Sequence, residues 1–115
     1  MAPRILLVED EVALRSLAAR ALRAEDYEVV EALDGLAAWA LAKRSPFDLL
    51  ITDTRMPYLS GTQLAVLVRE LHPTMPILRL CGSHYSGPEE IGVRTLFKPF
   101  EIDDLVAAVR SLLAS

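Results

Sequence analysis

Short apolar runs alternate with longer amphipathic stretches along the whole 115-residue chain. The runs are four to six residues long and rich in branched side chains, which is typical of strands. The runs that are apolar almost throughout suit strands buried on both faces of a sheet. Five such runs predict five strands, at residues 5–8, 28–32, 48–53, 76–81 and 94–97.

The stretches between the strands carry helical patterns. The last one starts at Ile102 and repeats apolar residues at helical spacing, with acidic residues in its first turn, where the helix dipole favours negative charge. Ser60 and Gln63 have the spacing of a capping box at the start of another helix. Asp34 is a suitable N-cap residue for an alanine-rich helix. The apolar residues that indicate the other three helices are Leu14, Leu17, Ala18 and Ala21 for the first, Leu64, Leu67, Val68 and Leu71 for the third, and Ile102, Leu105, Val106, Val109, Leu112 and Leu113 for the last.

This alternation predicts an α/β fold in which a five-stranded parallel sheet is doubly wound and carries helices on both faces. Right-handed crossovers leave few ways to wind such a sheet. The fourth crossover departs from the plan, because the twelve residues 82–93 contain three glycines and a proline. A helix of full length does not fit there, so we expect a stub around residues 88–91 or a loop alone.

Charged residues stand where three of the predicted strands end. Glu9 and Asp10 follow the first strand, and Asp53 ends the third. Lys98 follows the fifth strand. In the common strand order 2-1-3-4-5 the first and third strands are neighbours, so the three carboxylates would meet at the sheet edge where ligands bind, with the lysine close by. Two carboxylates about 4 Å apart repel each other by roughly 4 kcal/mol at an effective dielectric near 20.

A hard divalent cation would offset this repulsion, and Mg²⁺ prefers carboxylate, carbonyl and water oxygens. Lys98 adds a positive charge suited to phosphate. The pattern therefore predicts a pocket for a metal ion and an anion, in which one carboxylate could act as a nucleophile toward a phosphoryl group.

Composition narrows the class of protein. The net charge of −4 argues against an electrostatic nucleic-acid interface. Near the N-terminus only four consecutive apolar residues precede the first acids, too few for a signal peptide or a membrane span. The single cysteine, Cys81, excludes an internal disulfide and fits a reducing compartment. We therefore expect a cytoplasmic domain with no membrane segment and no direct nucleic-acid partner.

Three motifs in order resemble the receiver domain of response regulators in two-component signalling. They are "VED" at residues 8–10, "DTRMPYLSG" at 53–61, which fits D-x-x-M-P-x-x-x-G, and "KPF" at 98–100. Each motif alone is weak, but all three on the expected elements are specific. The resemblance covers roughly residues 4–113 and implies a flavodoxin-like sheet with strand order 2-1-3-4-5 in a single receiver domain spanning residues 1–115.

The resemblance also implies roles for individual residues. Asp53 would be the phosphoacceptor, taking a phosphoryl group from a histidine kinase or a histidine phosphotransferase. Asp10 and Asp53 would bind Mg²⁺, with Glu9 acting through water. The backbone carbonyl of Arg55 would be a further metal ligand, and Lys98 would contact the phosphoryl group. Beyond self-catalysed transfer and hydrolysis of this group, the resemblance implies no enzyme activity.

Two positions depart from the family pattern. Cys81 stands at the switch position, where the family usually has threonine or serine to contact the phosphoryl group, and a thiol is only a weak donor. Thr95 stands where the family usually has an aromatic residue that changes rotamer. Both changes, and the short fourth crossover, affect the coupling of phosphorylation to the outer face of the last helices. We expect the phosphoryl chemistry to be retained and the standard output to be altered.

Two further expectations come from the same resemblance. Pro99 follows Lys98 in a tight turn and would have a cis peptide bond, which is essentially a proline phenomenon. The guanidinium of Arg55 lies where the family varies the lifetime of the phosphorylated state, and it could screen the pocket or pair with Glu9.

Two alternative functions remain open. One is a pseudo-receiver that acts as a protein-docking module independent of phosphorylation, as the changes at the switch positions would allow. The other is a metal-dependent phosphohydrolase with an aspartyl intermediate. Haloacid-dehalogenase-like enzymes have a second aspartate two residues after the nucleophile, where this chain has Arg55, and they need an inserted cap for which no length remains.

Simpler interpretations exist for individual residues. Glu9 and Asp10 could be a solvated strand end, although Asp53 and Lys98 at the same edge argue against this. Cys81 could be a small core residue without a chemical role. The chain could be a stand-alone receiver or a piece of a larger regulator or hybrid kinase.

Overall fold

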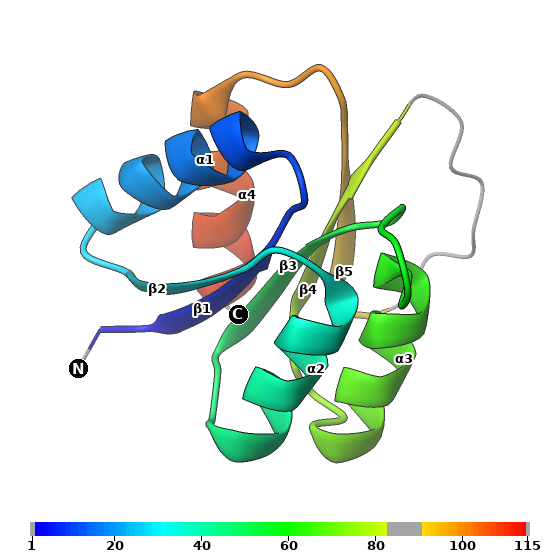
Figure 1. The fold of residues 1–115 in the computed structure, drawn as a ribbon. Coiled ribbons are helices and arrows are strands. Elements are labelled where there is room, and N and C mark those ends of the chain that lie inside the picture. The colour runs from blue at the N-terminus through cyan, green and yellow to red at the C-terminus, as the bar shows by residue number, and fades with distance from the viewer. Residues whose placement is uncertain (1, 83–90, 115) are drawn as a thin grey trace.

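Five parallel strands form one sheet in the order β2-β1-β3-β4-β5. The structure is a computed structural model that describes residues 2–82 and 91–114 (Figure 1). The predicted α/β class, the doubly wound parallel sheet and the strand order 2-1-3-4-5 are confirmed. The elements are β1 (Arg4–Val8), α1 (Val12–Ala24), β2 (Glu28–Ala32), α2 (Gly35–Arg44), β3 (Leu49–Asp53), α3 (Gly61–Leu71), β4 (Ile77–Cys81), β5 (Val93–Phe97) and α4 (Ile102–Leu113).

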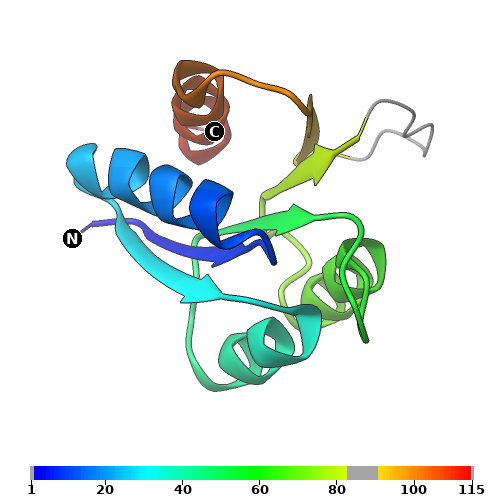
Figure 2. The same ribbon diagram turned by 45° about the horizontal axis from the view of Figure 1, so that its top comes forward.

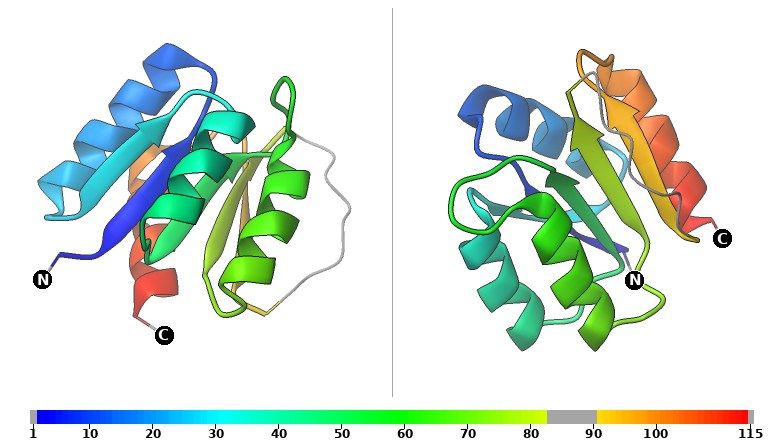
Figure 3. Two further views of the ribbon diagram at one scale, coloured as in Figure 1. Left: turned by 60° about the horizontal axis from the view of Figure 1, so that its bottom comes forward. Right: turned by 90° about the vertical axis from the view of Figure 1, so that its right-hand side faces the viewer.

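Helices cover both faces of the sheet, with α1 and α4 on one side and α2 and α3 on the other (Figures 2 and 3). Side chains along a strand point alternately to the two faces. In β1, Ile5 and Leu7 therefore enter the core under α1 and α4, while Leu6 and Val8 enter the core over α2 and α3. Because each face needs its own apolar set, the inner strands are apolar almost throughout, as the sequence indicated.

The predicted helix caps are present. The side chain of Asp34 accepts a hydrogen bond from the backbone N–H of Ala37 at 2.8 Å. Ser60 accepts from the N–H of Gln63 at 3.1 Å, and the Gln63 side chain accepts from the N–H of Ser60 at 3.0 Å. These bonds satisfy N–H groups that the first turn of a helix leaves without partners, and they fix where α2 and α3 begin.

The buried stripe of α1 differs from the predicted one. Leu17 is 50% exposed, whereas Ala18, Ala19 and Leu22 face the sheet. The buried residues lie one position after the predicted Leu17, Ala18 and Ala21, because α1 is rotated on the sheet by about one residue relative to the prediction. Leu71, at the end of α3, is also exposed.

The connection from β4 to β5 comprises residues 82–92. The stub predicted around residues 88–91 falls almost wholly on residues 83–90, outside the described part of the chain. The strand that follows, β5, is an edge strand, and its Phe97 is 47% exposed, whereas every residue of β3 and β4 is buried. Among the helices of residues 2–82 and 91–114, none is long and apolar enough to cross a membrane.

Gly61 allows the loop before α3 to lie directly against the end of β3. A Cβ atom at this position would be 1.7 Å from the carbonyl oxygen of Asp53 and 2.9 Å from the hydroxyl of Thr52. The Gly61 N–H also donates to the carbonyl of Thr54 at 3.1 Å. The absence of a side chain at Gly61 is therefore needed for the close approach that places Asp53.

We expect Gly61→Ala to lower the free energy of unfolding by about 1–3 kcal/mol, the usual cost of forcing an extra methyl group into a packed site. Urea unfolding followed by circular dichroism measures the loss. Gly82→Ala is the matched control, because nothing lies within 4 Å of a Cβ at Gly82. Equal stability of the two variants would contradict the prediction.

Candidate functional site

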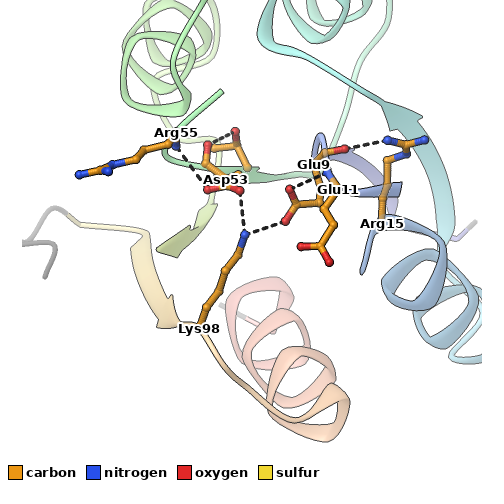
Figure 4. Close-up of polar contacts among 7 residues, drawn as sticks. Glu9, Glu11, Arg15, Asp53, Arg55 and Lys98 are labelled. Atoms are coloured by element: carbon orange, nitrogen blue, oxygen red, sulfur yellow. Dashed lines mark hydrogen bonds and ion pairs between the residues drawn. The ribbon is translucent and has the colours of Figure 1, made fainter. Parts of the chain in front are cut away.

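The ends of three strands bring charged side chains together at the carboxyl edge of the sheet (Figure 4). Glu9 and Asp10 follow β1, and Asp53 is the last residue of β3. One carboxylate oxygen from each of these three residues, called here the acid cluster, lies within 4.8 Å of the others. Lys98, just after β5, also reaches this point, so the predicted meeting of the four residues is present in the structure.

Lys98 joins the two buried members of the acid cluster. Its Nζ donates to Oδ2 of Asp53 at 2.8 Å and to Oε1 of Glu9 at 2.9 Å. The backbone N–H of Lys98 donates to the carbonyl of Cys81 at 2.7 Å, which continues the pairing of β4 and β5 by one residue. The predicted cis peptide bond between Lys98 and Pro99 is confirmed. The lysine stem thus starts at the edge strand and spans β4 to reach β3.

Both the side chain and the backbone carbonyl of Asp53 accept hydrogen bonds from neighbouring residues. Its Oδ1 accepts from the backbone N–H of Arg55 at 3.3 Å, and its carbonyl oxygen accepts from the hydroxyl of Thr52 at 2.9 Å. The guanidinium of Arg55 points away from Asp53 (Figure 4). The pairing of Arg55 with Glu9 considered from the sequence is not found among the described residues.

Glu9 is 1% exposed, and the pKa of its carboxyl group is raised to about 7. Burial is the largest cause, and the negative charge of Asp53 adds to it. Hydrogen bonds from Lys98 and from the N–H of Glu11, the latter at 3.2 Å, act in the opposite direction. The hydrogen bonds to Glu9 therefore do not fully offset the effect of its burial on the pKa.

Burial lowers the pKa of Lys98, but the ion pairs with Asp53 and Glu9 outweigh this effect and raise it above its usual value. The ammonium group is therefore charged, yet it is one positive charge facing three carboxylates. A divalent cation fits this imbalance, and the hard oxygen donors of the acid cluster are the ligands that Mg²⁺ takes. Asp10, the exposed member, leaves the site open to solvent.

Cys81 and Thr95, the two residues that depart from the family pattern, lie on the neighbouring strands β4 and β5. Cys81 ends β4 as a buried free thiol. The hydroxyl of Thr95 on β5 accepts a hydrogen bond at 3.3 Å from Nε of Arg79, a β4 residue that is only 6% exposed. Sequence reasoning missed Arg79 because a charged residue in a predicted buried strand gives no indication of its partner.

Sequence reasoning also missed Arg15 on α1. Its Nη1 donates to the backbone carbonyl of Glu9 at 2.8 Å, and its Nε pairs with Glu31 on β2 (Figure 4 shows the first contact). No motif marks this arginine, since basic residues on an amphipathic helix are common and usually face solvent.

The raised pKa of Glu9 predicts that the metal-free protein loses stability as the pH rises from about 4.5 to about 7. Between pH 4.5 and 7 the folded chain holds a proton on Glu9 that the unfolded chain has released, so the free energy of unfolding falls with pH. Urea unfolding in EDTA should show Glu9→Gln gaining on the wild type by up to about 3 kcal/mol over this range. A difference between the two proteins that stays constant with pH would contradict the prediction.

Comparisons with known proteins agree on one family. Residues 5–110 match the family model for the response regulator receiver domain. The response regulator receiver protein CpdR of Brucella abortus is 33% identical over 115 residues, which cover 96% of this chain and 96% of CpdR. The probable transcriptional regulatory protein TcrX of Mycobacterium tuberculosis is 32% identical over 114 residues, covering 95% of this chain but 49% of TcrX.

The chain thus spans about half the length of several curated relatives that it matches. Among solved structures, the receiver domain of the hybrid histidine kinase CckA superposes with a TM-score of 0.84 at 42% identity, covering 96% of this chain and 98% of that one. With a family match over most of its length, and relatives and a fold that agree with it, this chain belongs to the response regulator receiver domains of two-component signalling.

Proposed function

We propose that this chain is a phosphoacceptor receiver in which Asp53 takes a phosphoryl group from a phosphohistidine of a histidine kinase or histidine phosphotransferase. One observation carries the proposal: the Nζ of Lys98 lies between Asp53 and Glu9, at 2.8 and 2.9 Å, beside a cluster of three carboxylates. A lysine and an acid cluster around a buried aspartate combine a nucleophile with the groups that stabilise a transferring phosphoryl group.

In the proposed reaction, a carboxylate oxygen of Asp53 forms a bond to phosphorus while the bond from phosphorus to the donor imidazole nitrogen breaks. The electron pair of that bond stays on the imidazole. Lys98 is already within hydrogen-bonding distance of Asp53, so its charge is in place to stabilise negative charge on the transferred group without reorganisation. Water later hydrolyses the acyl phosphate, and we propose no further catalytic activity.

Glu9, Asp10, Asp53 and the backbone carbonyl of Arg55 would hold Mg²⁺. When bound, the ion would supply positive charge to the phosphoryl oxygens and to the carboxylates. The close placement of the three carboxylates supports this assignment, because one oxygen of each lies within 4.8 Å of the others and only Lys98 pairs with them among the described residues. Cytoplasmic localisation and the absence of nucleic-acid contacts remain part of the proposal.

The output of this receiver is proposed to differ from the standard one. At the switch position, the thiol of Cys81 is a weak donor toward a phosphoryl oxygen. At the position of the usual aromatic residue, the hydroxyl of Thr95 is bonded to the buried Arg79. Neither side chain offers the usual way to carry the signal to β5 and α4.

These same contacts favour a second candidate, a pseudo-receiver that docks a protein partner whether or not Asp53 is phosphorylated. The bond between Arg79 and Thr95 would keep β4 and β5 in one arrangement. The two candidates differ in whether Asp53 is chemically competent, which the following experiment measures.

We expect one phosphoryl group to be added when the protein is incubated with acetyl phosphate and Mg²⁺, as intact mass spectrometry would record. Asp53→Asn should abolish the added mass, and Lys98→Ala should reduce the rate by at least about tenfold, because a preorganised charge next to the reacting group is lost. Asp103→Asn, the same change at an exposed residue of α4, is the matched control. The proposal fails if the wild type gains no mass with acetyl phosphate or with a phosphorylated histidine phosphotransferase.

The altered output predicts a confined response to beryllofluoride, a mimic of the phosphoryl group. In amide NMR spectra, we expect shifts at the carboxyl edge of the sheet and only small ones at Thr95 and along α4. Cys81→Thr should extend the shifts toward Thr95 by restoring a hydroxyl donor, whereas the control Cys81→Ala should not. Equal shifts at Thr95 in the wild type and in Cys81→Thr would show that the thiol does not limit the switch.

A further inference from the structure

Arg15 makes an unusual pair of contacts for a helix residue near the site. It lies in the first turn of α1, and its side chain is only 14% exposed. Its Nη1 donates at 2.8 Å to the backbone carbonyl oxygen of Glu9 (Figure 4). That oxygen belongs to the peptide group that joins Glu9 to Asp10, so Arg15 acts directly on the backbone between two members of the acid cluster.

The other side of the guanidinium is anchored on β2. Its Nε lies 3.3 Å from Oε1 of Glu31, whose second oxygen pairs with Arg23 at 3.3 Å. The planar fork of an arginine fixes the directions of its donors once two of them are bonded. Glu31 therefore orients Arg15, and Arg15 in turn orients the peptide group after Glu9.

With this contact, all the polar atoms of Glu9 have partners. Its N–H donates to the carbonyl of Ala32 at 3.3 Å, and its carboxylate oxygens accept from Lys98 at 2.9 Å and from the N–H of Glu11 at 3.2 Å. Asp10 differs, because it is exposed and forms no ion pair among the described residues; its carboxyl group lies beside that of Glu9. No basic residue in the described part of the chain fixes the Asp10 side chain, so the backbone that carries it contributes to its position.

We propose that Arg15 is a positioning residue for the divalent-cation site: by fixing the peptide group between Glu9 and Asp10, it holds the Asp10 carboxylate within reach of Glu9 and Asp53. The inference rests on the proposed function, because it takes these three acids as the cation ligands. Arg15 touches neither the cation nor the phosphoryl group in this assignment.

The sign of the effect separates positioning from simple electrostatics. Arg15 carries a positive charge close to the acid cluster, so its removal would tighten Mg²⁺ binding if only charge mattered. Loss of positioning acts in the opposite direction, since Asp10 must then be ordered at the moment of binding. A weaker affinity after removal of Arg15 therefore cannot come from the loss of its charge.

The test is the Mg²⁺ affinity of Arg15→Met, which keeps an unbranched stem and removes the donors. Isothermal calorimetry and amide NMR titration with Mg²⁺ measure the affinity directly. We expect it to fall about tenfold, the lower end of the effect typical for residues that orient metal ligands. Arg23→Met is the matched control. It removes the same positive charge and an ion pair with the same partner, Glu31, but Arg23 makes no contact with Glu9. Its affinity should stay within about twofold of the wild type.

Arg15→Lys is the second variant, and it keeps the inference testable if Arg15→Met does not fold. Its ammonium can replace the bond to the Glu9 carbonyl but not the oriented fork, so its affinity should lie between those of the wild type and Arg15→Met. In NMR spectra of the metal-free proteins, the amide chemical shifts of residues 9–11 should change in Arg15→Met relative to the wild type. In Arg23→Met these shifts should be unchanged.

The outcomes are separable. If the wild type binds Mg²⁺ and Arg15→Met binds it equally well or more tightly, the positioning role is overturned and the proposed function stands. A wild type that does not bind Mg²⁺ overturns the cation site itself, and the inference with it. Equal losses in Arg15→Met and Arg23→Met would assign the effect to the ion pairs of Glu31 and overturn a role for the contact with Glu9.

Discussion

The repulsion among three carboxylates at one edge of the sheet is the constraint on which the site depends. Lys98 counters it by bonding to Asp53 and Glu9 at once, and it can do so because the strand order places β5 two positions from β3. One ammonium group faces three carboxylates, and burial together with the charge of Asp53 raises the pKa of Glu9 despite its bond to Lys98. The remaining imbalance makes this edge suitable for a cation and for the charged group that a receiver accepts.

The fold supplies rigid support for this unfavourable arrangement. The two apolar cores on either side of the sheet hold β1 and β3 in fixed register, and both strands end at the site. The close approach of Gly61 to the carbonyl of Asp53 packs the following loop against the end of β3. The stability stored in the cores thus offsets the electrostatic cost of burying Glu9 and Asp53, as is common at functional sites.

The half of the sheet formed by β4 and β5 is organised differently from the half that carries the acids. It places a buried arginine, Arg79, against Thr95, and it ends in the thiol of Cys81. The edge strand β5 is also less buried than the inner strands β3 and β4. The strands that carry the acids therefore match the family motifs, while β4 and β5 carry the residues that depart from the family pattern.

The sequence by itself determined the elements and the identity of the acid cluster and Lys98, because hydrophobic period and the charged residues at strand ends are local signals. The strand order that brings these residues together was implied by the resemblance to the receiver family. The sequence also determined the caps at Asp34 and Ser60. Only the tertiary structure decided which face of α1 is buried and that Arg15 reaches the Glu9 carbonyl. These depend on how a helix is rotated on the sheet and on single contacts between distant residues, and neither leaves a periodic trace along the chain.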